Sequence, residues 1–362
     1  MSPETAALQA IGWPVGADGQ PEFPPWREAL AAHPQARPAR VVEQHRTGYV
    51  VADGPQRSFK VESPPDWQRP KFPPEQRAGV GDWVLIEGGR IVGLLPRRST
   101  IKRGAAGEHY RQQLIAANVD TAFVVCGLDG DFNPRRIERY LLLVGGGAEP
   151  VVVLTKADLC PDADRARAAL AHVAADGVAI VAVNARERAS VAQLDRWLQP
   201  GRTAVLVGSS GAGKSTLTNT LLGIERMKTG EVRAHDSRGR HTTTYRALIP
   251  LPSGACLIDT PGMRELKPTG EEDVADTFAD VEAVAAECRF RDCSHQREPG
   301  CAVRAAIDAG TLDEDRFAHY LKLREEVEGA ARTLAQRRVQ KGEDKAPGRA
   351  PGKRVDNRHG RR

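Results

Sequence analysis

The chain contains 362 residues, of which 40% are hydrophobic and 27% are charged, an ordinary balance for a water-soluble globular protein. This length leaves room for roughly two to three domains with cores of their own. The sequence shows no signal peptide and no long apolar segment, which argues against a secreted or membrane-spanning protein and favours the reducing cytoplasm. The net charge of +5 and the pI near 8.9 favour an anionic partner.

The first third of the chain predicts a small β-barrel behind an N-terminal extension. Residues 1–36 are rich in proline and alanine and show no clear period, so their order is left open. Short alternating runs separated by glycine and proline then occupy residues 40–45, 49–51, 58–62, 82–87 and 90–95. Five such strands predict an OB-fold RNA-binding domain over residues 37–105. Trp83 and Phe59 could stack on bases there, but packing in the core is favoured for both.

A base-recognition motif follows the next buried strand. Residues 150–154 are apolar and β-branched, and Thr155, Lys156, Ala157 and Asp158 come directly after them. The carboxylate of Asp158 can accept hydrogen bonds from two donors of guanine that adenine does not present. Alone, such a tetrapeptide is more often a surface turn. Residues 181–185 end another strand candidate and could supply a backbone contact to the guanine oxygen.

A complete phosphate-binding loop lies further along, between an apolar strand at residues 202–207 and a helix that begins near residue 214. Its residues are Gly208, Ser209, Ser210, Gly211, Ala212, Gly213, Lys214, Ser215 and Thr216. The glycines let backbone N–H groups approach phosphate oxygens at the helix N-terminus. Lys214 is expected to reach the β- and γ-phosphates as a catalytic residue, and Ser215 to bind Mg²⁺. This loop makes the base-recognition interpretation of residues 155–158 the favoured one.

The order of the two motifs is informative, because ordinary guanine-nucleotide switches carry the phosphate loop first. Here the base motif comes first, which indicates a circularly permuted α/β P-loop GTPase domain, placed at residues 106–275. Such a permutation preserves the site, since ligands bind at the carboxyl ends of parallel strands however the strands are connected. A P-loop kinase or ATPase would share the phosphate loop but would not need Asp158, and a nucleotide panel would separate these classes.

The segment after the phosphate loop predicts the switch and the metal site. Residues 239–244 are polar and rich in threonine, suited to a mobile switch, although which threonine would bind Mg²⁺ is not decided. Asp259 ends a strand and is expected to hold Mg²⁺ together with Ser215, while the N–H of Gly262 can turn to the γ-phosphate. Met263 occupies the position where many GTPases carry a glutamine that orients water. His241 is the internal candidate for that role, and a structural or RNA-contacting histidine is the alternative.

A closed metal site is predicted in a further domain over residues 276–334. Cys288, Cys293, His295 and Cys301 offer three thiolates and one imidazole, the ligand set of one structural, tetrahedral Zn²⁺. Disulfides are the competing interpretation, disfavoured in a reducing compartment. The other cysteines, Cys126, Cys160 and Cys256, lie in or beside apolar runs and are expected in the core.

The C-terminal residues, 335–362, are predicted to form a basic disordered tail, because arginine and lysine alternate with glycine and proline without apolar periodicity. Nucleic acid is the expected target of the tail, and a purely solubilising tail is the alternative.

Taken together, the permuted motifs, residues 239–244, the run from Asp259 to Gly262 and the block from Cys288 to Cys301 resemble the ribosome small subunit-dependent GTPase A family over about residues 38–330. The resemblance implies an N-terminal OB-fold barrel, a permuted GTPase core, a helical zinc domain and late maturation of the small ribosomal subunit in bacteria. It implies as partners GTP, GDP, the small subunit and its rRNA, and we expect a monomer with no membrane contact. Thr155 stands where this family often has asparagine. A nucleotide-gated RNA-binding module with little hydrolysis of its own is the alternative function.

Overall fold

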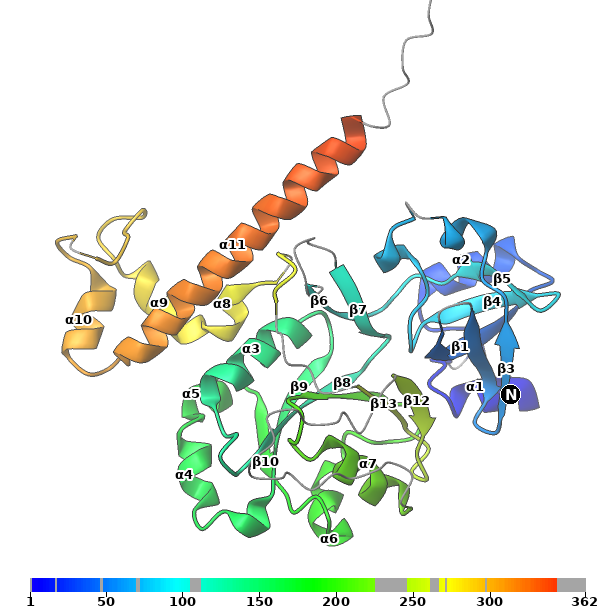
Figure 1. The fold of residues 1–362 in the computed structure, drawn as a ribbon, viewed down its shortest axis with the longest axis horizontal. Coiled ribbons are helices and arrows are strands. Elements are labelled where there is room, and N and C mark those ends of the chain that lie inside the picture. Colours follow the sequence, from blue (N-terminus) through cyan, green and yellow to red (C-terminus); the bar gives the residue numbers. More distant parts are fainter. Residues whose placement is uncertain are drawn as a thin grey trace, which may run out of the picture.

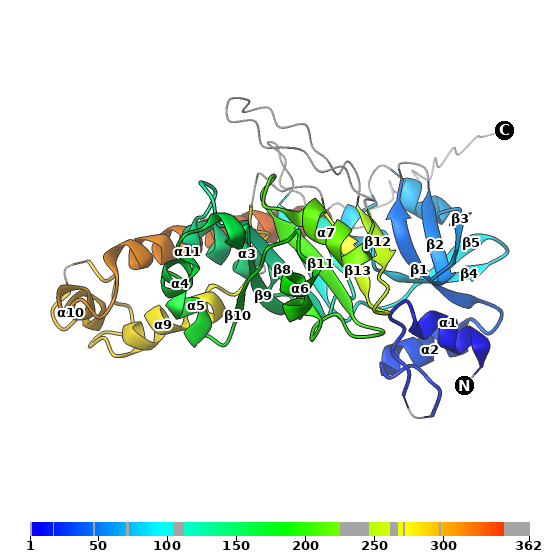
Figure 2. The same ribbon diagram turned by 90° about the horizontal axis from the view of Figure 1, so that it is seen from below.

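The computed structural model describes residues 2–16, 18–45, 48–69, 72–104, 112–224, 246–260, 267–270, 272–296 and 298–343. The predicted switch at residues 239–244, Gly262, Met263 and the tail from residue 344 onward lie outside these ranges. A search of the described residues finds no helix with the length and apolar content needed to cross a bilayer. A central parallel sheet carries the barrel at one end and a group of C-terminal helices at the other (Figure 2).

The N-terminal strands form a closed ring. Neighbouring antiparallel pairs join β1 (Arg37–Gln44) to β2 (Tyr49–Gly54), β2 to β3 (Arg57–Val61), β1 to β4 (Trp83–Glu87) and β4 to β5 (Arg90–Leu94). A parallel bridge between Glu62 and Arg90 brings the end of β3 against β5 and completes the ring. Two short 3₁₀ helices, η1 (Pro65–Gln68) and η2 (Pro74–Gln76), connect β3 to β4. The five strands coincide with the five predicted runs, because alternation of apolar side chains is a strong signal for half-buried strands.

The N-terminal extension, whose order the sequence left open, packs on this ring. It forms α1 (Pro3–Gln9) and α2 (Pro24–Ala32). The Trp13 ring lies 4.6 Å from both Trp26 and Trp83, measured between ring centroids, and the Trp26 indole donates to the Pro96 carbonyl at 2.7 Å. Trp83 is fully buried, which confirms core packing for it and removes it as a surface on which bases could stack. Phe59 is half-buried beneath the guanidinium groups of Arg37 and Arg57.

The central sheet orders its strands as β10 (Ala179–Ala182), β9 (Glu149–Thr155), β8 (Thr121–Gly127), β11 (Thr203–Gly208) and β13 (Cys256–Asp259), all parallel. Strand β12 (Ala247–Pro250) follows antiparallel to β13 and also pairs with β1 of the barrel. Alternate residues of these strands enter two separate cores, so both faces are covered. One core takes in α3 (Pro134–Val144), α4 (Ala163–Ala168) and α5 (Ala171–Ala175). The other takes in α6 (Arg188–Val191), η4 (Ala192–Leu194) and α7 (Lys214–Leu222). The run η3 (Ala157–Leu159) and the hairpin β6 (Thr100–Gly104) with β7 (Gln112–Ala117) complete this part.

The C-terminal helices enclose a third core. It is built from α8 (Val274–Thr277), α9 (Ala279–Ala286), α10 (Ala302–Asp308) and α11 (Glu314–Glu343), with Phe278, Leu323 and Val327 among its members. The last helix, 30 residues long, extends away from the sheet (Figure 1). This corrects the predicted tail boundary, since residues 335–343 continue α11. These residues contain no proline and one glycine, Gly342, and their arginine, lysine, glutamine and glutamate are good helix formers.

A buried arginine joins the barrel to the base of the sheet. Arg40 of β1 is fully buried and donates to the carbonyl of Ile11, to Thr203 Oγ1 at 2.8 Å and to the Asn118 carbonyl at 3.1 Å. Its Nε donates to the Gly81 carbonyl at 3.3 Å. Burial lowers the pKa of the guanidinium from its usual value. One hydrogen-bonded side chain therefore connects the extension, the barrel and the first residue of β11.

We expect Arg40→Met to lower the free energy of unfolding by about 1–3 kcal/mol, because buried acceptors lose their donor. Urea unfolding of the nucleotide-free protein measures this loss. The control is Arg90→Met, which removes an ion pair whose two side chains are each 69% exposed and is expected to have little effect. Equal urea midpoints for the two variants would contradict a structural role for Arg40.

Candidate functional site

The phosphate loop occupies the turn between β11 and α7, as the sequence predicts. Three of its glycines adopt positive φ: 154° at Gly208, 84° at Gly211 and 92° at Gly213, the N-cap of α7. An added Cβ at Gly208 would clash with the carbonyl oxygen of Val125 on the neighbouring strand. Glycine is therefore required where the loop leaves the sheet. The loop ends at a helix N-terminus, where backbone N–H groups and the helix dipole favour an anion.

Lys214, the first residue of α7, folds back over this loop. Its side chain is buried, and its ammonium donates to the carbonyls of Gly208 at 2.9 Å and Ser209 at 2.6 Å. Burial lowers the pKa of Lys214 to about 8, although the carboxylate charges of Asp259 and Asp131 oppose this shift. Both of the acceptors of these two hydrogen bonds are neutral carbonyls. An anionic phosphate would be a stronger partner for the ammonium, since charge-assisted hydrogen bonds are about twice as strong as neutral ones.

The base motif lies at the same edge of the sheet and is bonded to the phosphate loop. Thr155 ends β9, is fully buried, and donates from Oγ1 to the Ala212 carbonyl at 2.6 Å. Lys156 follows in the left-handed region, with φ of 59°, and forms an ion pair with Asp129. Ala157 is half-buried and donates its N–H to the Val183 carbonyl at 3.3 Å, while Asp158 is exposed. The structure thus brings the two halves of the predicted site together.

The predicted metal ligands lie on neighbouring elements. Asp259 ends β13 and pairs in register with Leu206 of β11, and it is 1% exposed. Ser215 and Thr216 lie in the first turn of α7, which packs against β11 and β13. Thr260 donates to the Leu206 carbonyl at 2.6 Å and so holds the chain that leaves β13. The predicted partners His241 and Gly262 lie outside the described residues.

One part of this site was missed by the sequence analysis. The loop after β8, residues 128–133, contributes Asp129, which pairs with Lys156, and Asp131, which accepts from Ser209 Oγ at 2.6 Å. Asp131 also forms an ion pair with Arg136 of α3. A signal was available, because two acidic residues directly follow an apolar run. The sequence did not show, however, that this run lies between the strands that carry the two motifs.

A second cluster lies between α9 and α10. The ligand atoms of Cys288, Cys293, His295 and Cys301 all lie within 4.8 Å of one another. The Sγ atoms of Cys288 and Cys301 are 4.0 Å apart, and His295 Nδ1 lies 3.5 Å and 3.6 Å from them. Ligand atoms 2.3 Å from a tetrahedral Zn²⁺ would be about 3.7 Å apart, so this cluster fits such an ion. All six cysteines, each within the described residues, are free thiols. Of the other three, Cys126 and Cys256 are buried as predicted, and Cys160 is half-buried.

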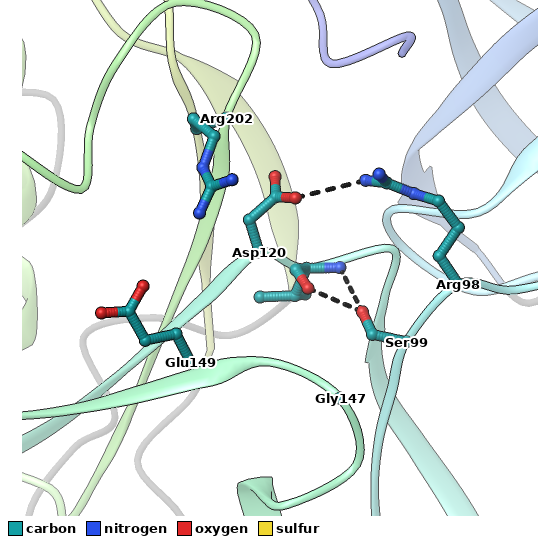
Figure 3. A pocket seen from close by; sticks show the side chains of 7 residues that line it. Arg98, Ser99, Asp120, Gly147, Glu149 and Arg202 are labelled. Carbon is teal, nitrogen blue, oxygen red and sulfur yellow. Dashed lines mark hydrogen bonds and ion pairs between the residues drawn. The ribbon is translucent and has the colours of Figure 1, made fainter. Parts of the chain in front are cut away.

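A hollow of about 310 Å³ lies at the opposite, amino-terminal edge of the sheet (Figure 3). Its lining residues are Arg98, Ser99, Val119, Asp120, Gly147, Glu149 and Arg202. Asp120 accepts from Arg98 at 3.3 Å and from the Thr203 N–H at 2.7 Å. Two arginines face two carboxylates there, so the charges balance and no class of ligand is favoured.

Comparisons with known proteins agree with this geometry. Residues 94–269 match the family model described as RsgA GTPase. The chain is 69% identical over 352 residues to the small ribosomal subunit biogenesis GTPase RsgA of Xanthomonas campestris pv. campestris strain B100, covering 97% of this chain and 96% of that protein. It is 68% identical over 353 residues to the protein of the same name from Xanthomonas oryzae pv. oryzae strain MAFF 311018, covering 97% of each.

Two solved structures share the fold. YjeQ from Thermotoga maritima superposes with a TM-score of 0.58 at 24% identity, covering 81% of this chain and 98% of that one. YloQ, described as a circularly permuted GTPase, superposes with a TM-score of 0.57 at 23% identity, covering 82% of this chain and 96% of that one. The permuted order of motifs predicted from the sequence therefore has counterparts in known folds.

We expect Thr155→Val to lower the free energy of unfolding of the nucleotide-free protein by about 1–2 kcal/mol, because the buried carbonyl of Ala212 loses its donor. Urea unfolding measures the change. Thr155→Ser keeps the hydroxyl and is expected to lose less. An unchanged free energy of unfolding in Thr155→Val, or a loss in Thr155→Ser at least as large as that in Thr155→Val, would contradict this role of the hydrogen bond.

Proposed function

This chain belongs to the RsgA GTPase family, and we propose that it hydrolyses GTP to GDP and phosphate while assisting the late maturation of the small ribosomal subunit. The observation that carries the proposal is the hydrogen bond from Thr155 to the Ala212 carbonyl. It joins the base motif to the phosphate loop, so one nucleotide can occupy both. The names of the relatives support the ribosomal role, and a reducing cytoplasm suits six free thiols.

Guanine is the base that suits Asp158. Its exposed carboxylate can accept from the ring N–H and the exocyclic amine of guanine, and the stem of Lys156 can cover the ring. Thr155 links the two motifs through its hydroxyl, although the family often carries asparagine at this position. The Ala157 N–H donates to the Val183 carbonyl, which places the base motif beside residues 181–185, the segment proposed to contact the guanine oxygen. We therefore assign GTP and GDP as the ligands.

The triphosphate is assigned to the phosphate loop. Its residues from Gly208 to Gly213 supply backbone donors, Lys214 binds the β- and γ-phosphates, and Gly262 would approach the γ-phosphate from the switch. Ser215 and Asp259 would hold Mg²⁺, which when bound neutralises the charge that develops on the phosphate oxygens. The buried position of Asp259 suits a carboxylate that pairs with a cation.

Hydrolysis needs a group that orients water. Met263 replaces the glutamine used by many GTPases, and we propose His241 for this role. Because His241 belongs to the predicted switch, its position would depend on the bound nucleotide and on the ribosome. Slow turnover alone and faster turnover on the small subunit follow from that arrangement.

The barrel is proposed as an OB-fold that contacts rRNA. Its ring runs in the order β1, β2, β3, β5, β4 and back to β1, the connectivity of a five-stranded Greek-key barrel. Arg37 and Arg57 lie beside Phe59 and share the one carboxylate of Asp53, which leaves a net positive charge in this group. The basic segment beyond α11 would add phosphate contacts.

We propose that the barrel domain spans residues 37–105 with the extension 1–36 packed on it, the GTPase domain residues 106–275 and the helical domain residues 276–334. We propose a monomer without membrane contact.

We propose one structural Zn²⁺ in the helical domain. Cys288, Cys293, His295 and Cys301 would fill all four positions, leaving none for a catalytic water. The cluster lies against the third core, whose members include Phe317, and His295 meets the Phe317 ring edge-on at 5.7 Å. The ion would therefore stabilise the packing of α9, α10 and α11.

We expect small ribosomal subunits to raise GTP turnover by up to about 10³-fold over the isolated protein, and large subunits to have no such effect. Lys214→Ala should abolish both rates because phosphate binding is lost. His241→Ala should keep nucleotide affinity and reduce mainly the stimulated rate. Phosphate release with and without subunits measures both. Tight GTP-dependent binding to subunits without stimulation would favour the alternative, a nucleotide-gated RNA-binding module.

We expect the purified protein to hold one zinc per chain, measured by elemental analysis. Cys293→Ser should release it and increase amide exchange across residues 276–334, because metal binding contributes folding free energy in small sites. Cys160→Ser, which lies outside the cluster, is the matched control and should keep the metal. Zinc that persists when Cys288, Cys293 and Cys301 are all replaced would place the ion elsewhere.

A further inference from the structure

The loop at residues 128–133 touches both nucleotide motifs. It leaves the carboxyl end of β8, which lies between β9 and β11, so its neighbours are the base motif on one side and the phosphate loop on the other. Asp129 pairs with Lys156, and Asp131 accepts from Ser209 Oγ at 2.6 Å. Two carboxylates thus hold the two halves of the site from a single loop.

This loop is continuous with α3, which extends the contact to the helix. Asn133 caps α3 by accepting from the Arg136 N–H at 3.0 Å. The Arg136 guanidinium pairs with Asp131, and its Nη1 lies 3.5 Å from Ser209 Oγ. The position of the first turn of α3 therefore determines how Asp131 meets the phosphate loop.

The same helix is bound on another side by α11. Glu138 is buried and accepts from Arg316 Nη1 at 2.6 Å and from His319 Nδ1 at 2.6 Å. Burial would raise the pKa of Glu138, but the hydrogen bonds from His172 and His319 and the charge of Arg316 lower it to about 2. The group is therefore a carboxylate at neutral pH, with a positively charged partner on α11.

One helical turn beyond Arg136, a bidentate ion pair joins α3 to α11. Arg139 Nη1 lies 2.5 Å from Glu326 Oε2, and Nη2 lies 3.0 Å from Oε1. The two side chains are 21% and 33% exposed, respectively, so solvent screens this pair less than a pair on the open surface. Leu142 of α3 is also a member of the core that α8 to α11 enclose.

These contacts join the phosphate loop to α11 through one short element, the loop at residues 128–133 and the first half of α3. Asn133 and Arg139 are separated by about 9 Å along the axis, at 1.5 Å per residue. Ile137 and Tyr140 are buried in the core of the sheet, which limits independent motion of the helix. Resting on the proposed GTPase function, we propose that α11 positions the phosphate loop through α3, with Arg139 as the positioning residue toward α11 and Asp131 as the one toward the phosphate loop.

The role differs from that of the nucleotide ligands. Arg139 pairs with Glu326 of α11, whereas Lys214 and Asp158 are the residues proposed to bind nucleotide, so its replacement is expected to leave binding intact. What changes is how firmly residues 128–133 are held against Ser209. A subunit that moves α11 would act on the same contact, which connects the helical domain to turnover without a direct contact to nucleotide.

The test breaks and rebuilds the Arg139–Glu326 pair. Arg139→Glu and Glu326→Arg are each expected to reduce subunit-stimulated kcat by roughly 3- to 30-fold, with the KM for GTP unchanged, and the double swap to recover most of the rate. Amide hydrogen exchange of the nucleotide-free protein should increase at residues 128–133 in each single variant and return in the double swap. Arg139→Gln is the milder replacement if Arg139→Glu does not fold.

Asp131→Asn gives the second arm. Combined with Arg139→Gln, it should reduce the rate by less than the product of the two separate effects, because both act on one contact. The matched control is Arg188→Glu, at the first residue of α6 in the same domain. It breaks the ion pair in which Arg188 Nη2 lies 3.1 Å and 3.0 Å from the two carboxylate oxygens of Asp195. It should change neither the stimulated rate nor exchange at residues 128–133.

The outcomes separate this inference from the proposed function. If small subunits do not stimulate the unmutated protein, the proposed function is wrong. The exchange measurement then still tests the contact between residues 128–133 and Ser209. Stimulation that survives in Arg139→Glu, with exchange raised near Glu326 alone and not at residues 128–133, would overturn the positioning role. A double swap that returns amide exchange to the unmutated level without restoring stimulated turnover would also overturn the positioning role.

Discussion

The parallel pairing of β9, β8 and β11 is the constraint on which the rest of this structure depends. Parallel strands present their carboxyl ends at one edge, so the chain segments that follow these three strands must meet there. The order in which the chain visits the strands does not affect that edge. A base motif that precedes its phosphate loop in sequence therefore still reaches it, and Thr155 closes the junction by donating to the Ala212 carbonyl.

Buried polar side chains attach the outer parts of the molecule to this sheet. At the amino-terminal edge, Arg40 connects the barrel and the extension to Thr203, the first residue of β11. Toward the carboxyl edge, Glu138 and Arg139 connect α11 to the helix that follows β8. Each link ends on or next to a strand whose carboxyl end forms part of the proposed nucleotide site. Forces on the barrel or on the C-terminal helices can thus reach the site through short, well-packed paths, which suits an enzyme proposed to respond to a large partner.

Local patterns explain which elements were predictable. The five barrel strands, the apolar strands of the sheet and the phosphate loop depend on side-chain alternation, continuous apolar runs and glycine spacing, and all were recognised. The grouping of Cys288, Cys293, His295 and Cys301 was predictable because three cysteines and a histidine at this spacing are typical of a metal site. Packing of the extension was not predictable, since Trp13 and Trp26 become core residues only once Trp83 covers them. The length of α11 was underestimated because basic composition was taken as disorder, although arginine, lysine and glutamine favour helix.

By itself, the sequence determined the permuted motif order, the phosphate-loop motif and the group of three cysteines and one histidine that could hold a metal, because each resides in a few residues close together along the chain. Only the tertiary structure decided that β8 lies between the two motifs, and hence that Asp129 and Asp131 belong to the site. The same holds for Arg139 and Glu326, which meet across two helices far apart in sequence. Single charged residues carry no local signature of their partners, and strand order is set by the packing of the whole sheet.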